Sequence, residues 1–330
     1  MDAVDRKLLN RLQSEFPFAP QPFREIALGL GLSPAEMLAR VKTLKEGGVL
    51  RQISAIFDSR RLGYQSTLVA LRLPFSELDK AGAAVSQHPG VSHNYSRNHI
   101  YNLWFTIALP PGQSLEEEVG RLAREAGAQG QLLLPMVRQF KLDARFDLVG
   151  EEALASIPSS TKAEAKPVKL SSLEMAAIRE LQEDLPLIER PFLDMAGRLG
   201  LGEEEFLALG RSLLERGIMR RYSAQLRHRQ AGFIANSMGC WIVPQGEEER
   251  VGQAMAFFSQ VSHCYQRPTY PDWPYNLFTM IHAQSRAGCE KAAHEISGAT
   301  GITDFILLFS MKEYKKARVK YLLETETLAR

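Results

Sequence analysis

The chain has 330 residues, a formal net charge of +2, 45% hydrophobic residues and 24% charged residues. These values are typical of soluble globular proteins, and they exclude a largely disordered chain or a collagen-like one. The longest apolar stretches, at residues 68–71 and 302–309, are far shorter than the ~20 residues that span a bilayer. The first ten residues show neither the basic region nor the apolar region that a secretory signal would have. We therefore expect a cytoplasmic protein of two or three domains that binds no membrane.

The cysteine content argues against a disulfide framework. Cys240, Cys264 and Cys289 are an odd number of cysteines, and none of them forms a CxxC pair. This pattern is typical of proteins in a reducing compartment, and it predicts neither disulfides nor a structural metal site. We expect all three to be small buried apolar residues.

The two halves of the sequence resemble each other. LQSEFPFAPQPF, from Leu12, aligns with LQEDLPLIERPF, from Leu181. Further on, VSHNYSRNHIYNLWFTI aligns with VSHCYQRPTYPDWPYNLFTMI, with four extra residues in the second copy. The unit spans about half the chain, which is too long for a solenoid repeat and indicates a tandem duplication. The alignment pairs Phe23 with Phe192, Ser54 with Ser223, His93 with His263, Arg97 with Arg267, and Tyr101 with Tyr275.

Each copy is predicted to begin with three short helices. In the first, Leu8, Leu9 and Leu12 share one helical face. The second covers about residues 23–30, and Ser33 followed by Pro34 is a typical start for the third. Three helices with a tight turn indicate a helix-turn-helix domain. We assign residues 1–55 and 173–222 to the two helix-turn-helix domains, and residues 151–172, rich in Ala, Ser, Lys, Glu and Pro, to a linker.

The second part of each copy alternates strands and helices. In copy one, we expect strands at 66–73, 91–95, 101–109 and 131–138, and helices at 75–87 and 115–126. In copy two, we expect strands at 238–244, 261–265, 276–282 and 302–309, and helices at 247–259 and 288–300. The order β-α-β-β-α-β is that of a ferredoxin-like sandwich. The predicted fold class is therefore α+β, with ferredoxin-like domains at residues 56–150 and 223–330.

A helix-turn-helix followed by this sandwich resembles the Lrp/AsnC class of regulators. The motifs HNYSRNHIYNLWFTI and HCYQRPTYPDWPYNLF are more specific, and they resemble those of the two subunits of siroheme decarboxylase, here fused in one chain. The resemblance implies a carboxy-lyase that removes CO2 from the C12 and C18 acetates of siroheme to give 12,18-didecarboxysiroheme. That product leads to heme d1 in denitrifiers, or to heme by an alternative route in anaerobes. No cofactor is implied beyond the iron of the siroheme substrate.

The residues of these motifs suit that chemistry. Loss of CO2 from an acetate on a pyrrole-type ring requires a proton for the methylene group and a held, desolvated carboxylate. Histidine is the usual proton donor at neutral pH, arginine binds carboxylates in a fork, and aromatic rings pack on a macrocycle. We expect catalytic roles for His93, His99 and His263. We expect substrate-binding roles for Arg97, Arg267, Tyr95, Tyr101, Tyr265, Tyr275, Trp104, Arg138 and Lys141.

The spacing of the first motif suggests an asymmetry between the copies. His93 and Tyr95 should share a strand face, and Arg97 and His99 should lie in the connection that follows. Tyr101 is predicted to share a face with the strand residues 103, 105 and 107. Because only copy one has a second histidine, we expect it to supply the proton. A histidine could equally ligate the siroheme iron, which leaves that role open. Surface or core positions are expected for His88, His228, His282 and His294.

Two other functions compete with decarboxylation, namely transcriptional regulation and heme binding without turnover. In a helix-turn-helix, the start of the third helix meets DNA. In copy two this segment is Gly202 followed by three glutamates, which would repel phosphates. In copy one, Arg40, Lys42 and Lys45 form only a modest basic face. We therefore expect no specific DNA binding. We expect the halves to pair as a pseudo-heterodimer with productive sites between them, and further self-association is left open.

Overall fold

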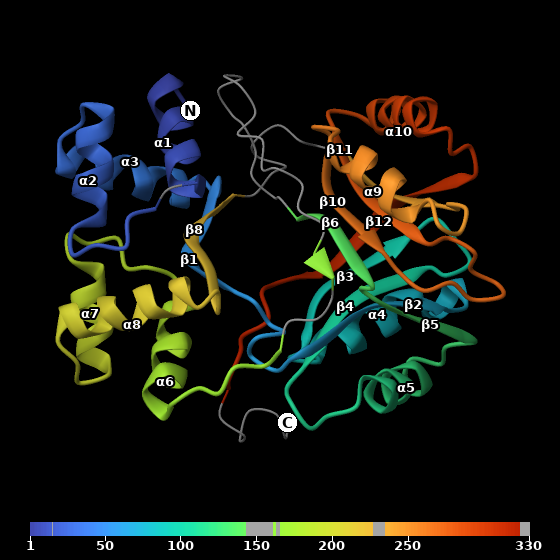
Figure 1. Cartoon of the computed structure of the whole chain (residues 1–330), viewed down its shortest axis with the longest axis horizontal. Helices are drawn as coiled ribbons and strands as arrows, with labels where there is room; N and C mark the ends of the chain where they lie inside the picture. The colour runs from blue at the N-terminus through green and yellow to red at the C-terminus, as the bar shows by residue number, and fades with distance from the viewer. Residues whose placement is uncertain (15, 143–160, 163–165, 227–234, 324–330) are drawn as a thin grey trace.

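The computed structural model describes residues 1–14, 16–142, 161–162, 166–226 and 235–323. These residues form two units that lie side by side (Figure 1). One unit is helical, and the other is built on a ten-stranded sheet. Each unit contains parts of both copies. Among the described residues, no helix has the length and apolar character needed to cross a membrane.

The helical unit contains the predicted three helices of each copy, each set followed by a strand. In copy one these are α1 (Ala3–Ser14), α2 (Pro22–Leu30), α3 (Pro34–Glu46) and β1 (Leu50–Phe57). In copy two they are α6 (Ser172–Leu181), α7 (Pro191–Arg198), α8 (Glu203–Glu215) and β8 (Met219–Leu226). Strands β1 and β8 run past the expected domain boundaries at residues 55 and 222.

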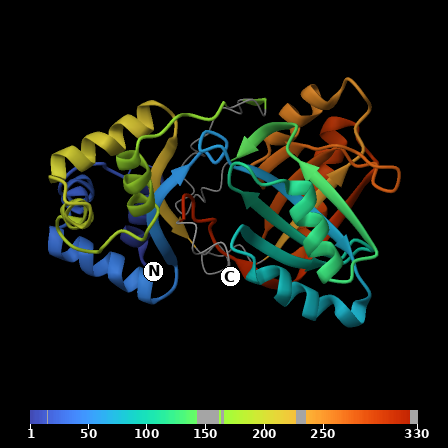
Figure 2. The ribbon, with the colours of Figure 1, turned by 90° about the horizontal axis from the view of Figure 1, so that it is seen from below.

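The two helix-turn-helix domains fold as one body. Strands β1 and β8 pair in an antiparallel ribbon in which Ser54 faces Ser223, and the helices of both copies lie beside this ribbon (Figure 2). These helices share one apolar core. The ring of Phe18 lies 4.6 Å from that of Phe192. A Cβ atom at Gly210 would lie 2.1 Å from the Phe18 ring, so glycine is required for this close packing. Sharing a core suits domains of this size, because a small domain alone buries little apolar surface.

The second unit contains both ferredoxin-like domains, whose predicted order of elements is confirmed in each copy. Copy one contributes β2 (Gln65–Arg72), the 3₁₀ turn η1 (Phe75–Glu77), α4 (Leu78–Gln87), β3 (Val91–Arg97), β4 (Leu103–Leu109), α5 (Leu115–Glu125), β5 (Gly130–Pro135) and β6 (Arg138–Leu142). Copy two contributes β9 (Ala235–Trp241), α9 (Glu248–Ala256), β10 (Val261–Gln266), β11 (Leu277–Ala283), α10 (Arg286–Thr300) and β12 (Phe305–Lys316). The short β7 (Thr161–Lys162) pairs with β6.

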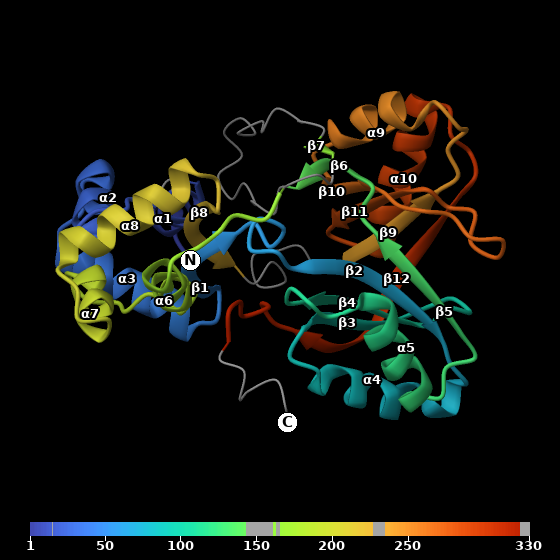
Figure 3. The same ribbon diagram turned by 60° about the horizontal axis from the view of Figure 1, so that its bottom comes forward.

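The strands form one sheet in the order β5-β2-β4-β3-β12-β9-β11-β10-β6-β7. Because β5 and β6 are separated only by residues 136–137, the two ends of this order lie close together and the sheet must curve. Helices α4 and α5 cover the outer face of copy one, and α9 and α10 cover that of copy two (Figure 3). The inner faces meet in a core that draws on both copies, formed by Ala70, Tyr101, Trp104, Leu132, Leu134, Met238, Cys240, Trp273, Phe278 and Leu308.

The copies exchange their final strands. The first part of β12 pairs with β9 of its own copy, and the second part pairs with β3 of copy one. In the same way β5 pairs with β2, and β6 pairs with β10 of copy two. Phe140 of β6 packs on Gly252 of α9, and Tyr314 of β12 packs on Gly82 of α4. The two halves of the chain therefore pair as a pseudo-heterodimer.

Three local predictions were wrong. The single strand expected at 131–138 is two strands, because the chain passes from one copy's sheet to the other at residues 136–137. Arg97 is the last residue of β3 rather than part of the connection. Tyr101 precedes β4 and packs in the core between the copies, whereas Leu103 faces the core under the copy-one helices.

Candidate active site

The sequence His-x-Tyr-x-Arg lies on β3 in copy one, and in copy two it runs along β10 and ends at Arg267, the residue that follows this strand. On β3, Asn94 points toward α4 and donates a hydrogen bond of 2.9 Å to the carbonyl of Gly82. Since neighbouring strand residues alternate in direction, His93, Tyr95 and Arg97 point to the inner face. The pairing register shifts between Val91 and His93, and it shifts at the equivalent place in β10. Such bulges re-aim side chains and are common beside active sites.

The two arginines of the motif bridge the copies. Nη1 of Arg97 donates a hydrogen bond of 2.8 Å to the carbonyl of Leu308 in copy two. Nη1 of Arg267 donates to the carbonyl of Leu134 in copy one. The Nε atom of each arginine is buried and has no hydrogen-bond partner among the described residues. Burial lowers the pKa of each guanidinium to about 10, so both remain charged at neutral pH. A buried cation without a carboxylate partner favours binding of an anion.

Each arginine also lies over the tyrosine of its own motif. The guanidinium of Arg97 is 5.8 Å from the ring centroid of Tyr95, and that of Arg267 is 5.2 Å from Tyr265. Burial raises the pKa of Tyr265 to about 12, even though the nearby arginine opposes this. Tyr265 is therefore a neutral phenol that can donate a hydrogen bond at neutral pH.

His93 lies in a basic environment. Its side chain is accessible to water, but protein atoms also crowd around the ring, and Lys316 of β12 pairs with it directly across the sheet. Desolvation, Lys316 and Arg51 together lower the pKa of His93 to about 4. The imidazole is therefore neutral at neutral pH, and its Nδ1 lies 3.0 Å from Oγ of Ser92.

His263 belongs to a hydrogen-bonded chain in copy two. Its Nδ1 lies 2.7 Å from Oγ of Ser262, and the same oxygen lies 2.7 Å from Nε2 of His282. Burial and Lys316 lower the pKa of His282 to about 4. His282, for which a surface or core position was expected, is half-buried on β11 and contacts the same serine as His263.

Sequence reasoning missed several cations that lie on β1 and β8 or, for Arg60, in the turn after β1. Arg51 of β1 influences His93 and donates a hydrogen bond of 2.8 Å to the carbonyl of Lys316. Arg60 and Arg220 lie within electrostatic reach of Tyr265 and each contacts Asp58 at 2.9 Å. Burial opposes ionisation of Asp58, but these two arginines hold its pKa well below its usual range. The duplication carried a usable signal, because LRQISA and MRRYSA place Arg51 and Arg220 at the same position.

The structure separates His99 from His93. His93 lies near the start of β3, whereas His99 lies two residues beyond its end, in the bend that follows Arg97. The strand from His93 to Arg97 alone spans roughly 13 Å. The His99 ring packs edge-on against Trp273, with centroids 5.4 Å apart, and burial lowers its pKa. Trp273 belongs to the insertion of copy two, so His99 contacts the other copy. The structure therefore does not bring the two copy-one histidines to one place.

The remaining aromatic candidates gather around the same insertion. The hydroxyl of Tyr101 donates a hydrogen bond of 2.5 Å to Asp272, and burial together with this bond raises its pKa to about 12. The rings of Trp104 and Tyr275 lie 5.3 Å and 4.9 Å from that of Trp273. These residues form an aromatic cluster between the copies at the His99 end of β3.

Arg138 and Lys141 point away from the inner face. Arg138 forms an ion pair with Glu249 of α9, and Nζ of Lys141 donates a hydrogen bond of 3.0 Å to the carbonyl of Phe258. The equivalent residues of β12 bind α4 and its C-terminal end, with Lys312 paired to Asp79 at 2.8 Å and Lys315 bonded to the carbonyl of Ser86 at 2.8 Å. These four cations therefore attach each final strand to the helix of the other copy.

The other histidines lie elsewhere. His88 pairs with Glu118 at 3.0 Å, and both line a cavity of about 710 Å³ that no predicted site residue lines. His294 is exposed on α10, and His228 lies outside the described residues. Cys240, Cys264 and Cys289 are buried and form no disulfide, as predicted. Among the described residues, no group of three His, Cys, Asp or Glu side chains could hold a metal ion.

Comparison with known proteins identifies the family. Residues 5–51 and 174–220 match the family described as siroheme decarboxylase NirDL-like HTH domain, and residues 61–141 and 230–315 match the AsnC-like ligand binding domain. The siroheme decarboxylase of Hydrogenobacter thermophilus is 40% identical over 319 residues, which cover 96% of this chain and 95% of that protein. The siroheme decarboxylase beta subunit of Methanosarcina barkeri is 43% identical over 151 residues, or 46% of this chain and 99% of that subunit.

A solved structure agrees with these matches. The crystal structure of the siroheme decarboxylase NirDL in co-complex with an iron-uroporphyrin III analogue has a TM-score of 0.75 and 36% sequence identity. The match covers 96% of this chain and 94% of that one. Sequence identity along the whole length, the matched helix-turn-helix domains and the shared fold together establish that the chain belongs to the siroheme decarboxylase family.

Proposed function

We propose that the chain is a siroheme decarboxylase that removes CO2 from the C12 and C18 acetates of siroheme. The observation that carries this proposal is the repeated sequence His-x-Tyr-x-Arg, which begins on β3 and on β10. The exchange of final strands brings these two strands into one curved sheet. Membership of the family supplies the reaction. The product would be 12,18-didecarboxysiroheme, for heme d1 or heme synthesis.

The charge around the two strands suits a substrate rich in carboxylates. Arg97 and Arg267 each keep a buried Nε free of any hydrogen-bond partner among the described residues. Arg51 flanks His93, and Arg60 and Arg220 flank Tyr265. Siroheme carries eight carboxyl groups, and arginine binds a carboxylate through two parallel hydrogen bonds. The arginines therefore hold the macrocycle by its acidic side chains.

Each decarboxylation breaks one C–CO2 bond and consumes one proton. CO2 leaves, the macrocycle accepts the electron pair, and the methylene carbon takes a proton to become a methyl group. Free His93 and His282 are neutral at neutral pH, so neither stores that proton before substrate binds. A carboxylate placed beside an imidazole raises its pKa, so binding of siroheme itself favours a charged histidine.

We assign the proton donor to His263 of copy two, in place of the copy-one histidines favoured by the sequence. Lys316 and Arg51 oppose a second positive charge on His93, and His99 lies beyond the other end of β3. Both His93 and His263 have a serine hydroxyl at Nδ1, but among the described residues only the serine of His263 also contacts a second histidine, His282. Neutral imidazole is the form that ligates iron, so His93 fits the role of iron ligand better than that of acid.

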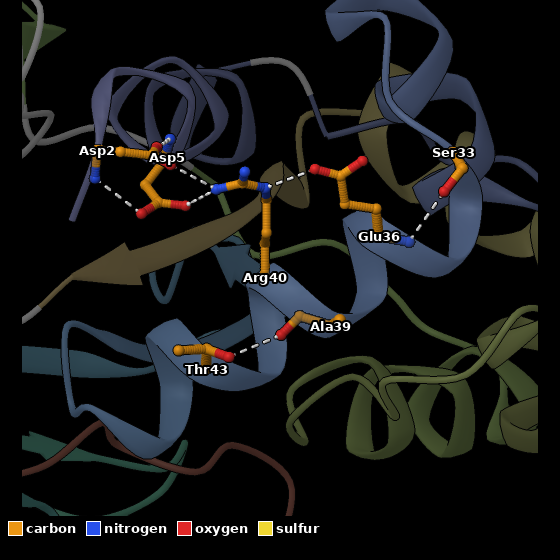
Figure 4. A network of polar contacts seen from close by, with 7 residues as sticks. All are labelled: Asp2, Asp5, Ser33, Glu36, Ala39, Arg40 and Thr43. Atoms are coloured by element: carbon orange, nitrogen blue, oxygen red, sulfur yellow. Dashed lines mark hydrogen bonds and ion pairs between the residues drawn. The ribbon is translucent and has the colours of Figure 1, made fainter.

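We assign the helical unit to a scaffold role without specific DNA binding. On α3, Arg40 is bound by Asp2 and Asp5 of the chain's N-terminus and by Glu36 of the same helix (Figure 4). Lys45 pairs with Asp184 at 2.5 Å. These ion pairs occupy much of the basic face that could otherwise meet phosphates.

Anaerobic incubation with siroheme, followed by mass analysis of the macrocycle, tests the proposed function. We expect the loss of two CO2 per siroheme. A macrocycle that binds and is recovered unchanged would identify a carrier instead.

A further inference from the structure

Ser262 connects two histidines of copy two. Its Oγ lies 2.7 Å from Nδ1 of His263 and 2.7 Å from Nε2 of His282. Consecutive residues of a regular strand point to opposite faces, so Ser262 would ordinarily point away from His263. The register shift between Val261 and His263 removes this restriction, because a bulge turns one side chain toward its neighbour's face.

Copy one has the serine and the first histidine of this hydrogen-bonded group but lacks the second histidine. Ser92 lies 3.0 Å from Nδ1 of His93, so the serine and the first histidine are common to both copies. The aligned segments NLWFTIAL and NLFTMIHA place Ala108 at the position of His282. An alanine side chain has no polar atom, so copy one has no second imidazole at this position. The difference between the copies is therefore local to one strand position.

The protonation state of His282 determines whether its ring can accept a hydrogen bond from Ser262. The half-buried ring is neutral at neutral pH, because burial and Lys316 both oppose its protonation. A neutral imidazole has one nitrogen that accepts a hydrogen bond. When His263 carries the proton, both of its ring nitrogens are donors. Nδ1–H of His263 can then donate to Ser262, and the serine hydroxyl can donate to Nε2 of His282.

We infer that His282 is a positioning residue that acts through Ser262 to hold protonated His263 in one orientation. The inference rests on the proposed function, because it takes His263 as the donor. In the reaction, the proton on Nε2 of His263 passes to the methylene carbon as CO2 leaves. The Nδ1 proton stays on His263 in its hydrogen bond to Ser262. His263 is left neutral with Nε2 unprotonated, ready to take the next proton from solvent.

Single-turnover decarboxylation by His282 variants tests the inference. We expect His282→Ala to lower the first-order rate roughly 10- to 100-fold, as for partners that orient metal-bound histidines, with siroheme affinity unchanged. His282→Gln should recover most of the rate, because its side-chain oxygen can accept from Ser262. His294→Ala, on the exposed face of α10, is the matched control and should match wild type. Wild-type rates for His282→Ala, or no recovery by His282→Gln, would overturn the inference.

A second measurement separates this inference from the proposed function. Nitrogen NMR of histidine-labelled protein without siroheme reports the tautomer of His263. We expect one dominant tautomer in wild type and a mixture in His282→Ala. Identical His263 nitrogen signals in the two proteins would contradict the inference even if both decarboxylate siroheme. A wild type that releases no CO2 would refute the proposed function and leave this spectroscopic result standing.

Discussion

The guanidinium of Arg97 in copy one donates a hydrogen bond of 2.8 Å to the backbone carbonyl of Leu308 in copy two. Arg267 makes the equivalent bond in the opposite direction, from copy two to Leu134 of copy one. The residues proposed to hold substrate therefore also join the two copies. Binding and stability are coupled at this point, and experiments on either arginine must measure both.

Replacing either arginine by lysine should weaken siroheme binding. Arg97→Lys and Arg267→Lys keep the positive charge but lose the fork that pairs with a carboxylate. The lost bond to the other copy should also lower the free energy of unfolding by about 1–3 kcal/mol. Siroheme titration and chemical denaturation check the two effects. Arg250→Lys, a substitution at an exposed position of α9, is the control. If Arg97→Lys and Arg267→Lys bind siroheme as tightly as this control does, these two arginines do not belong to the site.

The exchange of final strands depends on two glycines. A Cβ atom at Gly252 would lie 2.4 Å from the Phe140 ring, and one at Gly82 would lie 2.7 Å from the Tyr314 ring. Gly82→Ala and Gly252→Ala should each lower the free energy of unfolding by about 1–3 kcal/mol through overpacking. Gly298→Ala, in an open part of α10, should raise it by roughly 0.5–1 kcal/mol. Equal stability of all three variants would show that the exchanged strands do not pack as described.

Stability should fall in mild acid because of His93 and His282. Each has a folded-state pKa of about 4, below the ordinary value of 6.5, so the unfolded chain binds more protons between these values. The contribution is fully present above pH 6.5 and is lost as the pH falls toward 4. Denaturation across this range checks the prediction. In the variants His93→Gln and His282→Gln, the free energy of unfolding should fall less steeply as the pH is lowered. An unchanged dependence on pH in both variants would contradict the prediction.

The intact chain should not bind a DNA operator specifically. Glu204 and Glu205 are exposed at the start of α8, and Arg40 is already paired with three carboxylates. Any association should be weak and should disappear as salt is raised, because it would depend on general phosphate contacts. A footprinting experiment at physiological salt checks this. A protected site with nanomolar affinity would contradict the scaffold role of the helical unit.

Much of the fold could be predicted from the duplication, since each element in one copy has a matching pattern in the other. The exchange of final strands could not be. Residues 131–138 read as one continuous strand, and strand propensity does not specify which sheet a strand joins. Only the tertiary structure shows that the chain crosses between the copies at residues 136–137.

The candidate site was predictable only in part. His93, Tyr95 and Arg97 share a strand, so their spacing alone places them on one face. Arg51 is separated from them in the chain by β2, η1 and α4, and its approach to His93 depends on how the helical unit lies against the sheet. His282 was missed because copy one has alanine there, and its contact with Ser262 requires a bulge that strand alternation does not reveal.

The most direct test of the account is single-turnover decarboxylation of siroheme by His263→Ala and His93→Ala at matched occupancy. A general acid contributes about 10²- to 10⁴-fold to a rate, so His263→Ala should lose about that factor while still binding siroheme. His93→Ala should chiefly alter the optical spectrum of the bound iron. If His263→Ala stays within a few-fold of wild type while His93→Ala is inactive, the proton comes from copy one and the assignment to copy two is wrong.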